Sequence, residues 1–442
     1  MSVNYHARLS SVLVTGLAGC VNGAHMRQHD VTYTAVSRAD SDRARVQEID
    51  DTSLVVGGEL DRAKIVAAVL ARNPDLDVAR ATWRAAVAAY PSAVALDDPM
   101  ASYSIAPFSI GSDVPFGQRI EVSQKLPWPG KRDLSGDAAI ADAEAMQADY
   151  ESLRLDLAEA SVQAFDDLYI AARALEINQH HRDLLERIEK SALAQYTTGR
   201  ASQQDPLEAR TRIIELERER LMIEKQQRVA VAMLNRLLHR KVDADLPPPP
   251  ARLAIAASTA TERRPAHPKQ LAASARMRAR QAEVDEANLE FYPNFELMGS
   301  YDSMWNTWQH RWMIGIGIEI PLQRAKRSAD LERARAEQAK ATAELASVTN
   351  MLDEGRERAR REVDETTKAL DLYEKQLIPT ARERIDAALA GFTAGQNPFS
   401  TVVTAEHELR DVELAIERTR ADLDHQLATL ARFEGRIPGG TR

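Results

Sequence analysis

With 442 residues and a formal net charge of −9, the chain is long enough for two or three compact domains, and its acidic balance excludes the basic surface typical of nucleic-acid-binding proteins. Hydrophobic residues make up 44% of the chain and aromatic residues only 5%, and Ala, Leu, Glu and Arg dominate the longer stretches, as in long helices and coiled coils. The single cysteine excludes an intrachain disulfide framework and the Cys-rich zinc patterns.

Residues 1–19 are predicted to be a lipoprotein signal peptide. Their apolar run is shorter than the about 20 residues that a membrane-spanning helix needs. Cys20 follows Leu17-Ala18-Gly19 directly, an order that resembles the lipobox of bacterial lipoproteins. That resemblance implies cleavage before Cys20 and lipidation of Cys20, and Val21 in place of Asp favours the outer membrane over the inner one. An unprocessed signal with an incidental cysteine is the alternative.

A weak internal repeat with a period of about 195 residues predicts a duplicated structure. The first repeat covers 60–245 and the second 267–434. A lipidated segment, 20–59, precedes them, a Pro-rich linker, 246–266, joins them, and a short tail, 435–442, follows. Each repeat is predicted to contain a helix, two strands, a very long helix, a tight turn and another long helix. The matched segments are Asn73–Leu76 with His267–Leu271, Ile120–Arg132 with Ile314–Arg327, and Tyr196–Ser202 with Phe392–Pro398.

Long helices are predicted at about 131–195, 202–239, 325–390 and 399–433. At about 1.5 Å per residue the longest would reach roughly 95 Å, too long for a globular domain to enclose. Apolar residues recur at the seven-residue spacing of a coiled coil, namely Val402, Leu409, Ile416, Leu423 and Leu430 in the second repeat and Leu207, Ile214 and Leu221 in the first. Ordinary antiparallel hairpins and a wall of packed helices both fit this pattern.

Four segments, at about 101–107, 118–126, 295–302 and 312–320, alternate apolar with polar residues, as strands of a membrane β-barrel do. Trp305, Trp308 and Trp312 would supply an aromatic girdle at the membrane interface. A soluble sheet with one covered face gives the same alternation. Because four strands cannot close a barrel and lipid tolerates no open sheet edge, a barrel requires strands from other chains, and three copies would supply twelve.

Together, these motifs and their order resemble the TolC family of outer-membrane factors, and within it the lipidated CzcC and CusC branch that serves heavy-metal efflux. The resemblance covers about 60–433. It implies a mainly α fold with a small β part: a homotrimer with a twelve-stranded transmembrane β-barrel in the outer membrane and a periplasmic α-barrel of coiled-coil hairpins. It also implies two protein partners, a periplasmic membrane fusion protein and a proton-driven RND-type pump of the inner membrane.

The resemblance further implies that the two tight turns dock onto the fusion protein. These docking residues are Gly199, Arg200, Ala201 and Ser202 in the first repeat and Gly395, Gln396, Asn397 and Pro398 in the second. Residue chemistry alone predicts only left-handed glycine caps at the ends of long helices.

A tunnel constriction is predicted just beyond these turns. Asp205 and Glu208 lie three residues apart on one helical face, so that trimer symmetry would make them rings of carboxylates. Thr401 and Thr404 occupy the matching positions of the second repeat, where members of the family often carry gating aspartates. Asp205 beside Pro206 is alternatively a plain helix-start residue.

No arrangement of nucleophile, base or metal ligands is recognisable, and we predict no enzyme activity, catalytic residue, metal site or cofactor. The adjacent His180 and His181 would point about 100° apart on a helix. The predicted function is passive export of substrates, with heavy-metal cations favoured by the subfamily resemblance. An efflux channel for drugs or solvents with the same architecture is the first alternative, and a periplasmic coiled-coil adaptor lipoprotein is the second.

Overall fold

The computed structural model describes residues 23–46, 54–107, 116–255, 266–305 and 307–438. Cys20 and the predicted signal peptide lie outside these residues. The chain forms two compact units, each of which combines parts of both repeats. Unit 1 comprises Met1–Asp40, Ala79–Tyr150 and Lys269–Thr349, and unit 2 comprises Ser41–Val78, Glu151–Pro268 and Asn350–Arg442.

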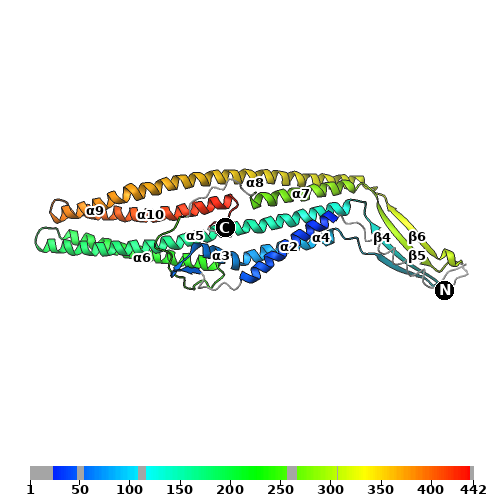
Figure 1. Ribbon diagram of the computed structural model, residues 1–442, viewed down its shortest axis with the longest axis horizontal. Coiled ribbons are helices and arrows are strands. Elements are labelled where there is room, and N and C mark those ends of the chain that lie inside the picture. Colours follow the sequence, from blue (N-terminus) through cyan, green and yellow to red (C-terminus); the bar gives the residue numbers. More distant parts are fainter. Residues whose placement is uncertain (1–22, 47–53, 108–115, 256–265, 306, 439–442) are drawn as a thin grey trace. The chain divides into compact units, whose positions relative to one another are not determined.

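Long helices dominate both repeats, as the sequence predicts (Figure 1). In the first repeat α5 (Lys131–Thr197) is followed by α6 (Gln204–Leu237). In the second repeat α8 (Arg324–Leu372), a π-helical turn η3 (Tyr373–Leu377) and α9 (Ile378–Thr393) lead to α10 (Phe399–Phe433). The uninterrupted helix predicted at 325–390 therefore contains a π turn that the sequence pattern did not indicate.

Unit 1 contains the four predicted strands as one antiparallel sheet in the order β3-β4-β5-β6. Its strands are β3 (Met100–Ala106), β4 (Gly117–Leu126), β5 (Asn294–Asp302) and β6 (Trp312–Glu319). Strand β4 of the first repeat pairs with β5 of the second, and the outer edges of β3 and β6 have no partner strand among the described residues.

Shorter elements complete the described parts of the chain. They are α2 (Gly23–Val46), β1 (Val55–Val56), β2 (Glu59–Leu60), α3 (Arg62–Arg72), α4 (Pro74–Ala93), α7 (Pro268–Leu289) and the 3-10 turn η2 (Trp308–His310). The sequence did not predict α2. Within unit 1, Val36 of α2 packs in one buried cluster with Trp83 and Val87 of α4 and Ala143 of α5. None of the described helices is long and apolar enough to cross a membrane.

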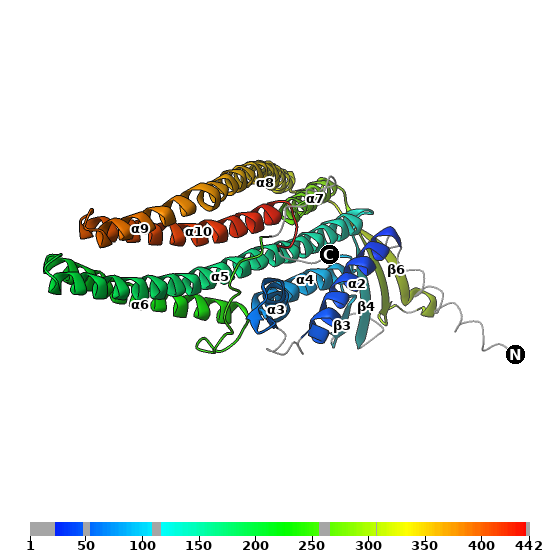
Figure 2. The ribbon, with the colours of Figure 1, turned by 60° about the vertical axis from the view of Figure 1, so that its left-hand side comes forward.

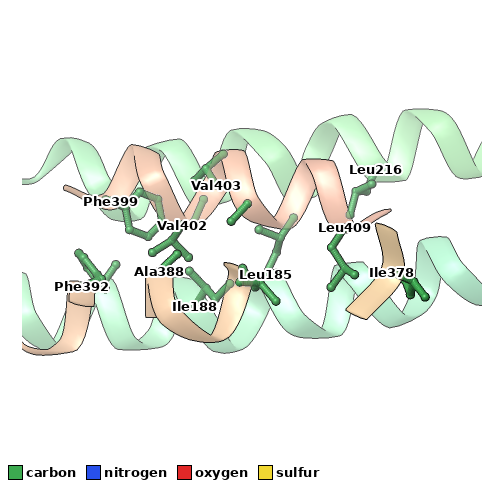
Figure 3. Packing of buried hydrophobic residues seen from close by; sticks show 14 of the residues in the cluster. Leu185, Ile188, Leu216, Ile378, Ala388, Phe392, Phe399, Val402, Val403 and Leu409 are labelled. Carbon is green, nitrogen blue, oxygen red and sulfur yellow. The ribbon is translucent and has the colours of Figure 1, made fainter. Parts of the chain in front are cut away.

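The core of unit 2 lies between the two helical hairpins, α5–α6 and α9–α10. Figure 3 shows Leu185 and Ile188 of α5 facing Val402 and Leu409 of α10, with Phe392 and Phe399 in edge-to-face contact at one end. All five predicted heptad residues of α10, from Val402 to Leu430, are buried.

The heptad series predicted for α6 lies on the exposed face of this helix. Leu207, Ile214 and Leu221 are exposed, and the buried face of α6 carries a different seven-residue series shifted by two positions: Ala209, Leu216, Ile223, Ala230 and Leu237. Helix α6 therefore has one apolar face inside unit 2 and a second apolar stripe that nothing in the described chain covers.

Candidate functional site

The turn between α5 and α6 ends α5 with a left-handed cap. Gly199 has φ +72°. Its N–H donates to the carbonyl of Tyr196 at 2.9 Å, and the N–H of Arg200 donates to the carbonyl of Gln195 at 2.9 Å. These two bonds form a Schellman motif, which pairs helix carbonyls that would otherwise lack donors. Gly199, Arg200 and Ser202 are exposed and Ala201 is half-buried, so that this turn is accessible in the single chain.

The turn between α9 and α10 repeats this geometry. Gly395 has φ +71°, its N–H donates to Phe392, and the N–H of Gln396 donates to Gly391. Pro398 has the extended conformation of an N-cap residue and begins α10. Gln396 and Pro398 are exposed and Asn397 is half-buried against Gly391. Figures 1 and 2 both show the two turns at the same end of unit 2.

The far ends of these hairpins carry the same cap, which confirms the duplication independently of sequence motifs. His239 has φ +53° after α6, and Gly435 has φ +73° after α10. Gly199 and Gly395 are 196 positions apart, and so are His239 and Gly435. The caps therefore lie at matching positions in the two hairpins.

The predicted constriction residues occupy the first two turns of α6 and α10. Asp205 and Glu208 are half-buried, and the N–H of Asp205 donates to the carbonyl of Ser202 at 3.2 Å. Thr401 is half-buried, and the exposed Thr404 donates its hydroxyl to the carbonyl of Ser400 at 2.9 Å. Helix-start positions thus account for these residues within one chain, and the predicted carboxylate rings require three copies.

His181, which the sequence offered only as a neighbour of His180, links the repeats through two carboxylates that were not predicted. His181 of α5 is fully buried between two carboxylates of α10: Nδ1 lies 2.8 Å from Glu406 Oε1 and Nε2 lies 3.1 Å from Glu413 Oε2. Burial lowers the pKa of His181, but the hydrogen bonds and negative charges of Glu406 and Glu413 outweigh it and raise the pKa above its ordinary value. The sequence signal was absent because each partner lies more than 200 positions away.

Two buried aspartates, one on α5 and one on α10, lie close enough for the charge of Asp424 to act on Asp166. Asp166 and Asp424 are 3% and 2% exposed, and Arg62 of α3 forms an ion pair with Asp424. Neither carboxylate oxygen of Asp166 has a hydrogen-bond partner among the described residues. Among those residues no group of three or more His, Cys, Asp or Glu side chains has the geometry of a metal site.

A cavity of about 680 Å³ in unit 2 lies beside the π turn. Its arginines are already paired: Arg420 with Glu374 of η3 and with Glu417, Arg252 with Glu374, Arg173 with Glu176, and Arg382 with Glu413. The lining is therefore charge-balanced and offers no unpaired cation to an anionic ligand.

One face of the sheet in unit 1 is apolar over all four strands. Tyr103, Ile120, Tyr301 and Trp312 lie in one row, and Ala101, Val122, Gly299 and Ile314 lie in the row two residues further along the strands. The opposite face carries mainly polar residues, including Glu121, Ser300 and Glu296. Ile314 is 85% exposed and Ile316 73% exposed, so no described part of the chain covers this apolar face. Trp305, Trp308 and Trp312, predicted as an aromatic girdle, are exposed as well.

Comparison with known proteins agrees with this architecture. Residues 260–436 match the family described as outer membrane efflux protein. A search of curated proteins gave no match.

Solved structures show the same fold over most of the chain. The outer-membrane channel OprN has a TM-score of 0.76 at 20% identity, covering 86% of this chain and 91% of that chain. A membrane protein from Pseudomonas aeruginosa has a TM-score of 0.74 at 21% identity, covering 89% and 94%. CusC, described in connection with transmembrane channel formation, has a TM-score of 0.73 at 16% identity, covering 85% and 92%. Residues 260–436 thus match the outer membrane efflux protein family, and the chain has the same fold as the outer-membrane channel OprN and CusC, which is the fold that the sequence resemblance implied.

Proposed function

We propose that the chain is one protomer of a trimeric outer-membrane efflux channel that passively conducts substrates received from a periplasmic fusion protein and an inner-membrane pump. The observation that carries this proposal is the four-stranded sheet, whose apolar face is uncovered and whose two outer edges are unpaired in the part of the chain that the structure describes. An exposed apolar sheet face is unfavourable in water and favourable in lipid. Unpaired edges inside a bilayer are not tolerated, so the edges of β3 and β6 must pair with other copies.

The exposed stripe of α6 supports assembly from identical copies. Leu207, Ile214 and Leu221 are each more than half exposed and keep the coiled-coil spacing, so a helix of a neighbouring copy can cover them. With four strands from each chain, three copies give the twelve strands that the resemblance implies.

The hairpin turns are proposed to dock onto the fusion protein. This proposal is supported by the exposure of Gly199, Arg200, Gln396 and Pro398 at one end of unit 2. The helices that precede both turns end in Schellman motifs. Asp205 and Glu208, with Thr401 and Thr404, are proposed to line the constriction directly behind these turns.

Two finer features rest on sequence resemblance. Cys20 is proposed to carry the lipid anchor, and heavy-metal cations are proposed as the cargo. The support for this cargo is the resemblance of the sequence motifs to the CzcC and CusC branch. The periplasmic adaptor remains the second candidate function, but an adaptor has no use for a sheet with an exposed apolar face and open edges.

Assembly is tested by measuring the mass of the purified full-length protein in detergent. We expect a monodisperse trimer. Replacing Leu207, Ile214 and Leu221 together with Glu should yield monomers, because the covered stripe would then bury charges without partners. The matched control is Val242→Glu, an exposed position outside the stripe, which should remain trimeric. A monodisperse monomer or dimer of the wild type would contradict the channel architecture.

A further inference from the structure

The seam between α5 and α10 contains the pair of buried carboxyl groups Asp166 and Asp424. This seam joins the first repeat to the second within unit 2. On the two sides of the pair, Val162 packs with Ala428 and Tyr169 packs with Ala421 in apolar clusters. The two carboxyl groups are thus enclosed by apolar contacts, and each is more than nine-tenths buried.

The charges around Asp166 are unbalanced if both carboxyl groups are ionised. The groups that face it are Asp424 of α10, Arg62 of α3 and the adjacent Asp167 on its own helix. Arg62 forms its ion pair with Asp424, and both oxygens of Asp166 lack a hydrogen-bond donor among the described residues. A buried carboxylate without a donor or cation is strongly unfavourable, and a group in this position takes up a proton instead.

We propose that Asp166 and Asp424 form a proton-binding site in which Asp166 holds one proton and donates it in a hydrogen bond to Asp424, whose charge Arg62 balances. A single proton makes Asp166, Asp424 and Arg62 neutral as a set and gives Asp166 a hydroxyl that donates to the carboxylate of Asp424. The site ties α5 of the first repeat to α10 of the second and to α3, and it acts within one chain, whether or not the chain forms a channel.

Electrostatics support this arrangement. Burial and then the charge of Asp424 raise the pKa of Asp166 to about 9, against the opposing effect of Arg62. The ordinary value is near 4. Between these two values the folded chain binds one proton more than the unfolded chain does, so stability declines as the pH rises. Above the folded-state pKa two buried carboxylates face one guanidinium, and the seam is weakest there.

The test compares full-length wild type with Asp166→Asn, whose amide provides a donor to Asp424 at every pH. Helical unfolding is followed in detergent from about pH 6 to about pH 8.5. If the folded chain binds one extra proton, the unfolding equilibrium constant of the wild type should rise about tenfold per pH unit relative to that of Asp166→Asn. Asp183→Asn, which changes an exposed carboxylate on the same helix, should follow the wild type. Parallel pH profiles for wild type and Asp166→Asn would overturn the proposal.

Infrared spectroscopy of the wild type tests the same site without a substitution, in case Asp166→Asn does not fold. A carbonyl band of a protonated carboxylic acid at about pH 7.5 that disappears by about pH 10.5 supports the site, and absence of the band at the lower pH overturns it. A loss of stability on addition of EDTA at neutral pH would also overturn it, because a divalent cation would then occupy the place of the proton.

Discussion

His181 holds α10 through two carboxylates, and this contact makes a residue-scale prediction about pH. The pKa of His181 is raised in the folded chain by Glu406 and Glu413. The stabilisation from its charge is therefore fully present below the unfolded-state pKa, about 6.5, and is lost as the pH rises through the higher folded-state pKa.

We predict that His181→Gln destabilises the chain by about 3–5 kcal/mol at pH near 6, because two carboxylates lose a buried partner. The difference from the wild type should shrink as the pH rises. Chemical unfolding at several pH values measures both effects. His180→Gln is the matched control, since His180 is exposed on the same helix. Equal destabilisation by the two substitutions would show that the Glu406 and Glu413 contacts do not stabilise the seam.

At the scale of residues, local chemistry was predictable and distant pairing was not. The left-handed caps predicted at Gly199 and Gly395 are confirmed by their positive φ angles, because glycine after a long helix is a local signal. The pairs His181–Glu406 and Asp166–Asp424 bring together residues more than 200 positions apart. Nothing in the sequence near Asp166 distinguishes it from the neighbouring exposed Asp167.

The sheet makes a prediction at the scale of elements. Ile316 lies in the middle of β6 on the uncovered apolar face, and Met313 lies on the opposite face of the same strand. If the apolar face contacts lipid, Ile316→Lys should cost up to about 2–4 kcal/mol of membrane insertion. Met313→Lys should be tolerated.

The measurement is the fraction of each variant that stays in the outer membrane after urea extraction. Ile316→Lys should be depleted and Met313→Lys should match the wild type. Equal retention of the two variants would mean that the apolar face of the sheet does not contact lipid.

Helices and strands were predictable where their two faces lie in different environments, because such an element has a periodic sequence pattern. Period-two alternation predicted all four strands, because a sheet with unlike faces repeats every second residue. The π turn at Tyr373–Leu377 left no such trace. Helix α6 carries two apolar seven-residue series, one buried and one exposed, and the predicted series is the exposed one. Hydrophobicity alone does not distinguish a contact within the chain from a contact with another copy.

The whole molecule is predicted to carry a cation-attracting collar behind its hairpin turns. Three copies of Asp205 and Glu208 would bring six carboxylates together, where like charges reinforce one another's field. Replacing both with Asn and Gln should lower conductance and cation preference in planar bilayers, most clearly at low salt where screening is weak. Replacing Asp243 and Asp245, two exposed carboxylates beyond the other end of α6, with Asn removes the same charge away from the turns and serves as the control. A double variant that keeps wild-type selectivity at low salt would place the constriction elsewhere.

Architecture at this scale was predicted from the duplication, the alternating strands and the resemblance to the TolC family. Helix length alone left ordinary antiparallel hairpins and a wall of packed helices open. The number of copies and the cargo proposed for this chain depend on surfaces whose partners are other molecules. The stripe that contains Leu207 is one such surface, because no described residue covers it.

Electrical recording from purified full-length protein in a planar lipid bilayer tests most directly whether this chain forms an outer-membrane channel. We predict stepwise, ohmic conductance from trimers, abolished when Leu207, Ile214 and Leu221 are replaced with Glu and unchanged by Val242→Glu. Trimers that insert into the bilayer and conduct no ions under any salt or voltage would contradict the function proposed for this chain.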